Sequence, residues 1–85
     1  MFIEDIKIGM KVVPVSKTII LNNGEPSVRP ANSSVAYRAA LEVGQEYLYV
    51  IAVDIRRERI LCNIREVRGG DYFKEYDLEP WVENS

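Results

Sequence analysis

The chain has 85 residues, of which 47% are hydrophobic and 28% are charged, and its formal net charge is −2 at pH 7. This length predicts a single domain, residues 1–85, with one modest core, and the composition is that of an ordinary globular protein. The chain has no histidine and one cysteine, Cys62, so it lacks the side chains of the usual catalytic triads, zinc sites and internal disulfides. We therefore predict no catalytic residue, no metal ion and no cofactor, and we expect a protein that is not an enzyme.

The hydropathy pattern shows no run of about 18 apolar residues, which a membrane-spanning helix would need. The first residues also lack the basic and apolar regions of a signal peptide, so we expect a cytoplasmic protein that does not enter a membrane. Charge is unevenly spread, because residues 29–68 hold seven arginines against five acids and residues 69–85 hold one lysine against five acids. A weakly acidic chain is not drawn to nucleic acid as a whole, although a local basic patch could be.

The first third of the chain predicts two short strands. One covers residues 11–15 after a turn at Gly9. Pro14 within it cannot donate to a sheet ladder, which predicts an edge strand or a proline whose amide nitrogen faces out of the ladder. Residues 18–21 are rich in β-branched side chains and predict a second short strand. Residues 22–26 contain Asn, Gly and Pro and predict an exposed turn, and residues 27–32 predict irregular structure.

Residues 34–42 predict a helix of two to three turns. Ser33 or Ser34 can accept a hydrogen bond from a backbone N–H at its start, and Gly44 stands where a glycine ends many helices. Tyr37, Ala40 and Leu41 fall on one face by their spacing.

Residues 47–53 give the strongest strand prediction of the chain. Alternation places Leu48, Val50 and Ala52 on one face and Tyr47, Tyr49, Ile51 and Val53 on the other, so both faces are apolar. Something is therefore expected to cover the second face. The simpler prediction is the helix of residues 34–42 folded over it; the alternative is a protein partner or a second copy of the chain, with Tyr49 and Ile51 as contact residues.

The last third predicts a meander. Residues 54–58 connect to a strand over 60–64, and Gly69-Gly70 turns the chain into a short strand at Tyr72-Phe73. Residues 74–78 predict a one-turn connector with Leu78 as its apolar plug, followed by a last strand over 79–82. Cys62 is expected to be a packing residue of the core. Trp81 is expected to close the core as well, although a tryptophan next to a proline on a terminal strand can also form a contact site for a partner.

This order of elements resembles the SH3-like barrel. The segment Asp71-Tyr72-Phe73-Lys74-Glu75-Tyr76-Asp77-Leu78-Glu79-Pro80-Trp81 is similar to the end of short SH3-like and KOW-like domains of uncharacterised bacterial and phage proteins. The resemblance implies a mostly-β, small barrel of about five strands, with one short helix inserted in a long first loop. It also implies a phage or mobile-element origin. The chain lacks the Ala-Leu-Tyr-Asp-Tyr-type run and the Trp-Trp pair of SH3 domains that bind proline-rich peptides, and a fold does not by itself imply a function.

Arginines form the other candidate site. Barrel loop tips can present arginine to phosphates, and Tyr72 and Tyr76 could stack on bases. Because acidic residues alternate with the arginines, a solvated hairpin with local ion pairs is the competing interpretation. The acidic residues near the C-terminus match no calcium loop. The candidate arginines are Arg56, Arg57 and Arg59, at or beside the hairpin tip, and Arg65 and Arg68, at the far end of the return strand.

From these patterns we expect a small non-catalytic module that binds another protein. The alternative is an accessory domain that binds nucleic acid through the arginine-rich hairpin. A homodimer is compatible with the first expectation, since an apolar sheet face can be covered by a second copy.

Overall fold

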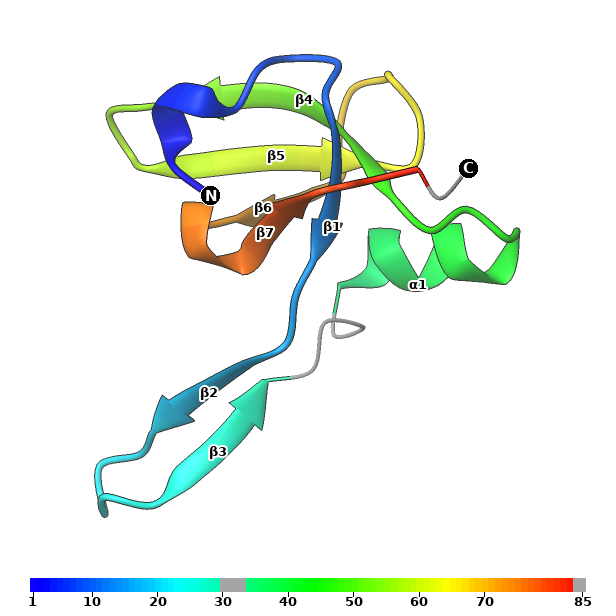
Figure 1. Cartoon of the computed structure of the whole chain (residues 1–85). Helices are drawn as coiled ribbons and strands as arrows, with labels where there is room; N and C mark the ends of the chain where they lie inside the picture. Colours follow the sequence, from blue (N-terminus) through cyan, green and yellow to red (C-terminus); the bar gives the residue numbers. More distant parts are fainter. Residues whose placement is uncertain (30–33, 84–85) are drawn as a thin grey trace.

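The computed structural model describes residues 1–29 and 34–83. These residues are mostly β, with one α-helix and short 3-10 helices among them (Figure 1). In chain order the elements are η1 (Ile3–Asp5), β1 (Lys11–Pro14), β2 (Lys17–Ile20), β3 (Pro26–Arg29), α1 (Val35–Glu42), β4 (Leu48–Asp54), β5 (Arg59–Asn63), β6 (Asp71–Phe73), η3 (Glu75–Asp77) and β7 (Leu78–Pro80).

Five strands form one antiparallel sheet in the order β6-β5-β4-β1-β7. The predicted meander, the one-turn connector and the short last strand are all present, the connector as η3. The predicted barrel is wrong as a closed structure, because β6 and β7 remain the two edges and no pairing among the described residues joins them. Each edge strand has only three residues, and Pro80 has no N–H to donate, which limits pairing along the β7 edge.

Strand β1 is not an edge strand, contrary to one of the two expectations for Pro14. It lies between β4 and β7. Its register with β4 covers only Lys11 and Val12, however, while Pro14 is opposite Leu78 of β7. The proline therefore stands beyond the stretch paired with β4, where its missing N–H costs no ladder hydrogen bond.

Strands β2 and β3 form a separate hairpin, which we call the arm (residues 17–29). Its register runs from Lys17 opposite Arg29 to Ile20 opposite Pro26, and it projects away from the sheet (Figure 1). The prediction of irregular structure is wrong for residues 27–29, which are a strand, and residues 30–32 lie outside the described residues. Pro26, predicted in the turn, begins β3. Pro26 and Ser27 have low strand propensity, so the sequence did not predict this strand. It forms because it pairs with β2.

Helix α1 begins and ends as the sequence predicts. The Ser34 hydroxyl accepts a hydrogen bond from the Tyr37 N–H at 3.1 Å, and Gly44 has φ +79° and donates its N–H to the Leu41 carbonyl at 3.0 Å. Such positive φ is favourable only for glycine. Ala40 is fully buried, so the side of the helix that carries this small side chain faces the core.

The core lies between α1 and one face of the sheet. Leu78 is 1% exposed, which confirms its prediction as the apolar plug, and Cys62 is fully buried as predicted. Trp81 is only partly buried, so its assignment to the core is wrong. The buried apolar residues are Ile6, Val12, Ala40, Leu48, Val50, Ile60, Cys62 and Leu78.

A β-bulge in β4 changes which residues share a face. Val50 is opposite Cys62 but Ala52 is opposite Leu61, so Ile51 is the extra residue. After the bulge Val53 packs against the core and Ala52 is exposed, which overturns the simple alternation predicted for residues 47–53. A single inserted residue exchanges the two faces because the side-chain period of a strand is two.

The helix covers the opposite face from the one predicted. Ala40 packs in the same cluster as Leu48 and Val50, whereas Tyr49 and Ile51 lie on the outer face of the sheet and are half-buried. The prediction that the helix of residues 34–42 covers the outer face is therefore wrong. The alternative, a protein partner or a second copy on that face, stays a prediction.

Candidate interaction surface

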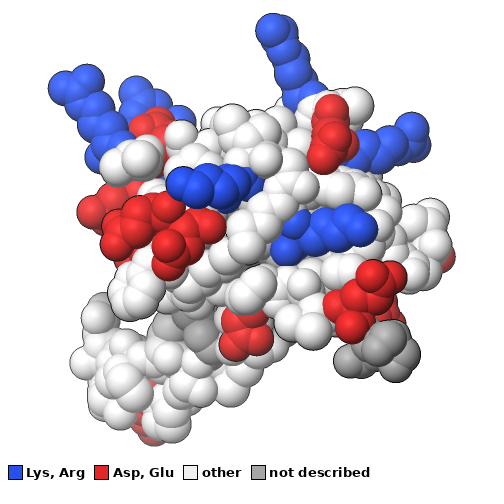
Figure 2. Space-filling view, turned by 45° about the horizontal axis from the view of Figure 1, so that its top comes forward, with Lys and Arg blue, Asp and Glu red and all other residues white. Residues whose placement is uncertain are grey.

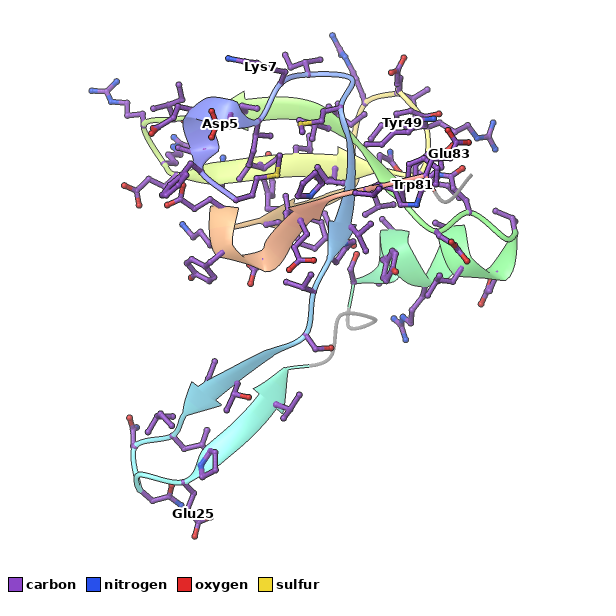
Figure 3. All side chains as sticks on the ribbon, in the orientation of Figure 1. Asp5, Lys7, Glu25, Tyr49, Trp81 and Glu83 are labelled. Carbon is purple, nitrogen blue, oxygen red and sulfur yellow. The ribbon has the colours of Figure 1, made fainter. Side chains whose placement is uncertain are left out.

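An aromatic cluster lies where β1, β4 and β7 meet, and it consists of Lys11, Tyr47, Tyr49 and Trp81. Lys11 is opposite Tyr49 in the register of β1 with β4. Trp81 follows β7 directly and donates its backbone N–H to the Lys11 carbonyl at 3.1 Å. The backbone ladder therefore brings β1, β4 and the end of β7 together at this cluster. Figure 3 labels two of its members, Tyr49 and Trp81, which lie close together in that view.

The three rings contact one another in the spatial order Tyr49, Tyr47, Trp81, with Tyr47 in the middle. The centroids of Tyr47 and Tyr49 are 5.3 Å apart at an interplanar angle of 86°, an edge-to-face contact. The centroids of Tyr47 and Trp81 are 4.8 Å apart at 51°. The Lys11 Nζ lies 4.7 Å from the Tyr47 centroid and 5.3 Å from that of Trp81, so the ammonium is held by cation–π attraction. These contacts preorder four large side chains at the surface.

The two tyrosine hydroxyls of the cluster are 3.4 Å apart. The hydrogen bond with Tyr47 raises the pKa of Tyr49 above 10.0, and desolvation and the negative charge of Glu66 raise it further. The Tyr49 hydroxyl is therefore protonated at neutral pH. It offers a partner a neutral donor and acceptor beside an apolar ring.

Trp81 separates two shallow grooves. One has a volume of about 470 Å³ and runs between α1 and the segment after β7, with Tyr37, Leu41 and Val82 in its lining. The other, of about 270 Å³, is lined by Tyr47 and residues 43–46. Val43 and Val82 at their margins are 72% and 73% exposed. The linings of both grooves are about as polar as they are apolar, and a tryptophan at a concave surface is typical of contact sites.

Ile51 lies in a different hollow from Trp81. This hollow of about 340 Å³ is lined by Ile8, Gly9, Val50, Ile51 and Glu66. Of the two outer-face residues predicted as contacts, Tyr49 thus belongs to the aromatic cluster, and Ile51 forms a second apolar site beside it.

The five candidate arginines do not form one patch. Arg56 and Arg57 lie in the turn between β4 and β5, whereas Arg65 and Arg68 lie in the loop that follows β5. Figure 2 shows, on the face it draws, basic side chains scattered among uncharged and acidic residues rather than joined in a continuous patch. The separation agrees with the sequence prediction, which placed Arg65 and Arg68 at the far end of the return strand from the hairpin tip.

Arg59 is engaged within the molecule. Its guanidinium carbon lies 4.2 Å from the Tyr72 ring centroid, and its Nε is 3.8 Å from Asp54 Oδ2. The Arg57 Nε is 3.9 Å from the same oxygen. Asp54 therefore neutralises part of the basic charge at this turn, as the competing interpretation of local ion pairs predicted.

Metal-ligating groups and the thiol are two further kinds of candidate functional group. Within residues 1–29 and 34–83, no group of three His, Cys, Asp or Glu side chains could hold a metal ion. Burial raises the pKa of the Cys62 thiol to about 12, so a nucleophilic thiolate is not formed near neutral pH. No helix in these two ranges is long and apolar enough to cross a membrane.

Sequence reasoning missed Lys11 and Tyr47 as site residues, because Tyr47 was placed on the outer face but without neighbours. Trp81 was assigned first to the core, with a contact site for a partner as the alternative. The signal for that alternative was the sequence Pro80-Trp81 on a terminal strand, and the structure leaves the ring half-buried. Comparison of the chain with models of protein families, with curated proteins and with solved structures finds no match.

Proposed function

We propose that the protein is a small non-catalytic interaction module that binds another protein through the aromatic cluster Lys11, Tyr47, Tyr49 and Trp81. The observation that carries this proposal is the set of three half-buried rings and one lysine held in mutual contact on the uncovered face of the sheet. Tryptophan and tyrosine are the residues most often responsible for binding energy at protein interfaces. Because the rings are preordered by their own contacts, binding costs little side-chain entropy.

The test is affinity capture from a lysate, compared between the wild type and matched variants. Trp81→Ala and Tyr49→Lys alter the cluster, whereas Tyr76→Ala removes an exposed ring of η3 that lies outside it (58% exposed). We expect proteins retained by the wild type and by Tyr76→Ala to be lost from both cluster variants. The unfolding midpoint of each variant must stay close to that of the wild type. Equal retention by all three variants would reject the cluster as the binding surface.

The strand order supports relating the domain to SH3-like barrels. A three-strand meander β4-β5-β6, a 3-10 connector and a return strand β7 beside β1 are the elements that the resemblance implies. The open edges between β6 and β7 are the departure from it. We propose this relation as one of topology, and function rests on the aromatic cluster instead.

Nucleic-acid binding is the second candidate, and one observation favours it. Tyr72 is 57% exposed with Arg59 stacked on it, and the Lys74 Nζ reaches the nearby Arg57 carbonyl at 3.3 Å. A ring with basic side chains around it is the usual arrangement for a single-stranded base and its phosphate.

This candidate is tested by titration with a fluorescent single-stranded oligonucleotide at several salt concentrations. Binding at this turn requires a steep loss of affinity with salt and loss on Arg56→Glu with Arg57→Glu. The double variant Arg65→Glu with Arg68→Glu, at the far end of β5, serves as the charge-matched control. Absent or salt-insensitive binding would reject this candidate.

A further inference from the structure

The larger of the two grooves beside Trp81 contains two glutamates. Glu46 lies in the loop before β4 and Glu79 lies within β7, and both line this groove of about 470 Å³ together with Trp81. Both glutamates are exposed. Among the residues that the structure describes, neither carboxylate has an ion-pair partner. Their negative charge is therefore uncompensated within the described chain and is available to a ligand.

The same sign of charge recurs around the aromatic cluster. The smaller groove also includes Glu46, and the hollow at Ile51 includes Glu66. Within the described part of the chain, no lysine or arginine lines either groove or this hollow. Lys11 is the base of the cluster itself, and its ammonium lies against two of the aromatic rings. A partner that approaches the cluster therefore meets a surface in which carboxylates outnumber basic groups.

The larger groove also offers apolar contact next to these charges. Tyr37 and Leu41 line it from α1, where they stand one turn apart on the same side of the helix. Val82 lines it from the segment after β7. Leu41 is 43% exposed and Val82 is 73% exposed. The volume lies in the range of ligand pockets, which suits a short extended segment with one or two side chains inside the groove.

We propose that the partner of the aromatic cluster enters the larger groove with an extended segment that carries an arginine or a lysine next to an apolar residue. The basic side chain pairs with Glu46 and Glu79, and the apolar side chain packs against Leu41 and Val82. Charge complementarity selects this occupant, because an acidic segment or a nucleic-acid backbone would be repelled by both carboxylates. The inference rests on the proposed function and adds the chemistry of the partner to it.

The test is selection from a phage-displayed library of random octapeptides, with the full chain as bait. We expect the peptides selected by the wild type to be enriched in arginine or lysine next to an apolar residue. The double variant Glu46→Gln with Glu79→Gln removes both charges and keeps the size of both side chains, so this enrichment should disappear. Glu25→Gln changes an exposed glutamate at the tip of the arm and should select the same peptides as the wild type.

Fluorescence anisotropy with one selected peptide then separates the charged contact from the apolar one. The double variant Glu46→Gln with Glu79→Gln should weaken binding about fivefold at low salt, and this difference should vanish near about 1 M salt, where charges are screened beyond about 3 Å. Trp81→Ala should weaken binding at least about thirtyfold at both salt concentrations, because a central ring acts through apolar burial. If Trp81→Ala does not fold, Leu41→Ser on the exposed side of α1 takes its place.

The outcomes distinguish this inference from the proposed function. Peptides that need Trp81 but carry no excess of basic residues, or that bind the double glutamine variant as tightly as the wild type, would overturn the inference and leave the aromatic cluster as a binding surface. A library that yields no binder would also overturn the inference, since it requires an extended segment, while capture from a lysate still tests the proposed function. Peptides that bind Trp81→Ala and Leu41→Ser as tightly as the wild type would overturn both.

Discussion

The sheet and the arm are both made of antiparallel strand pairs, but only the sheet buries its side chains. In β4 and β5, Leu48, Val50, Ile60 and Cys62 have no exposed surface. In the arm, Ile20 and Val28 remain 70% and 64% exposed in strands that are just as regularly paired. Backbone pairing exchanges hydrogen bonds with water for hydrogen bonds within the chain and gains little, so burial of apolar area decides which strands are stable by themselves. The same contrast sets how each region responds to substitution.

The largest difference is expected between two glycines of positive φ. An added Cβ at Gly70 would lie 1.9 Å from the Cys62 carbonyl oxygen, whereas at Gly24 of the arm it would meet no atom within 4 Å. We expect Gly70→Ala to cost about 4 kcal/mol or more of unfolding free energy, because two backbone segments must separate. Gly24→Ala should cost about 1 kcal/mol, from backbone conformation alone. Urea unfolding measures both free energies. Equal costs would mean that β5 and the turn at Gly70, just before β6, are not in close contact.

The second difference is between apolar side chains of the two regions. Leu48→Ala removes a side chain with no exposed surface and should cost about 2–5 kcal/mol, from lost burial and the cavity left behind. Ile20→Ala in the arm should change the free energy of unfolding by less than about 0.5 kcal/mol, because the Ile20 side chain is 70% exposed. Thermal and urea unfolding give both values. A large cost for Ile20→Ala would show that the arm packs on the body.

A smaller effect is expected where α1 is tied to the sheet. Asp71 Oδ2 of β6 accepts hydrogen bonds from the Ser34 hydroxyl at 2.6 Å and from the Ala36 N–H at 2.9 Å. Asp71→Ala leaves both donors partly buried without this partner and should cost about 1–3 kcal/mol. Glu25→Ala at the exposed arm tip is the matched carboxylate and should cost less than about 0.5 kcal/mol. Circular dichroism during urea unfolding gives both free energies. Equal values would mean that the hydrogen bonds to Asp71 do not hold α1 to the sheet.

The smallest effect follows from the buried thiol of β5. Burial raises the pKa of Cys62 from 9.0 to about 12, so above pH 9 the unfolded chain loses this proton while the folded chain keeps it. Stability should therefore be intact below pH 9 and fall as pH rises from 9 towards 12. The slope reaches at most about 1.4 kcal/mol per pH unit.

The control for this pH dependence is Cys62→Ala, which keeps every other titrating group. We expect the difference in unfolding free energy between the wild type and Cys62→Ala to decrease by about 1.4 kcal/mol between pH 9 and pH 10.5, as the unfolded thiol ionises. Urea unfolding at each pH measures it. Parallel curves for the two proteins would mean that the thiol has the same access to solvent in the folded and unfolded states.

Local signals predicted those parts of the fold that depend on neighbouring residues. The cap at Ser34 and the stop at Gly44 follow from hydrogen-bond and φ preferences within one turn. The strands of residues 47–53 and 60–64 follow from runs of β-prone side chains. The bulge at Ile51 could not be predicted in this way, because it is a property of the register between β4 and β5 and leaves no mark on β4 alone.

The candidate site was predictable only in part, for the same reason. Tyr49 and Ile51 were recognised as outward-facing because alternation holds up to the bulge. Trp81 joins Tyr47 only because β7 pairs with β1 and β1 pairs with β4, which brings residues more than 30 positions apart into ring contact. The two groups of arginines, in contrast, were predicted at opposite ends of the return strand, and the extended form of β5 keeps them apart as expected.

By itself, the sequence determined the mostly-β class, the single helix with its two ends, and the burial of Leu78 and Cys62. Each of these depends on propensity, on turn chemistry or on the apolar character of one segment, all of which act over a few residues. Tertiary structure alone decided that the sheet stays open, that the helix covers the face of Leu48 and not that of Tyr49, and that residues 17–29 stand apart as an arm. These outcomes depend on which distant strands pair and in what register, and pairing energies between distant strands are not contained in any local stretch of sequence.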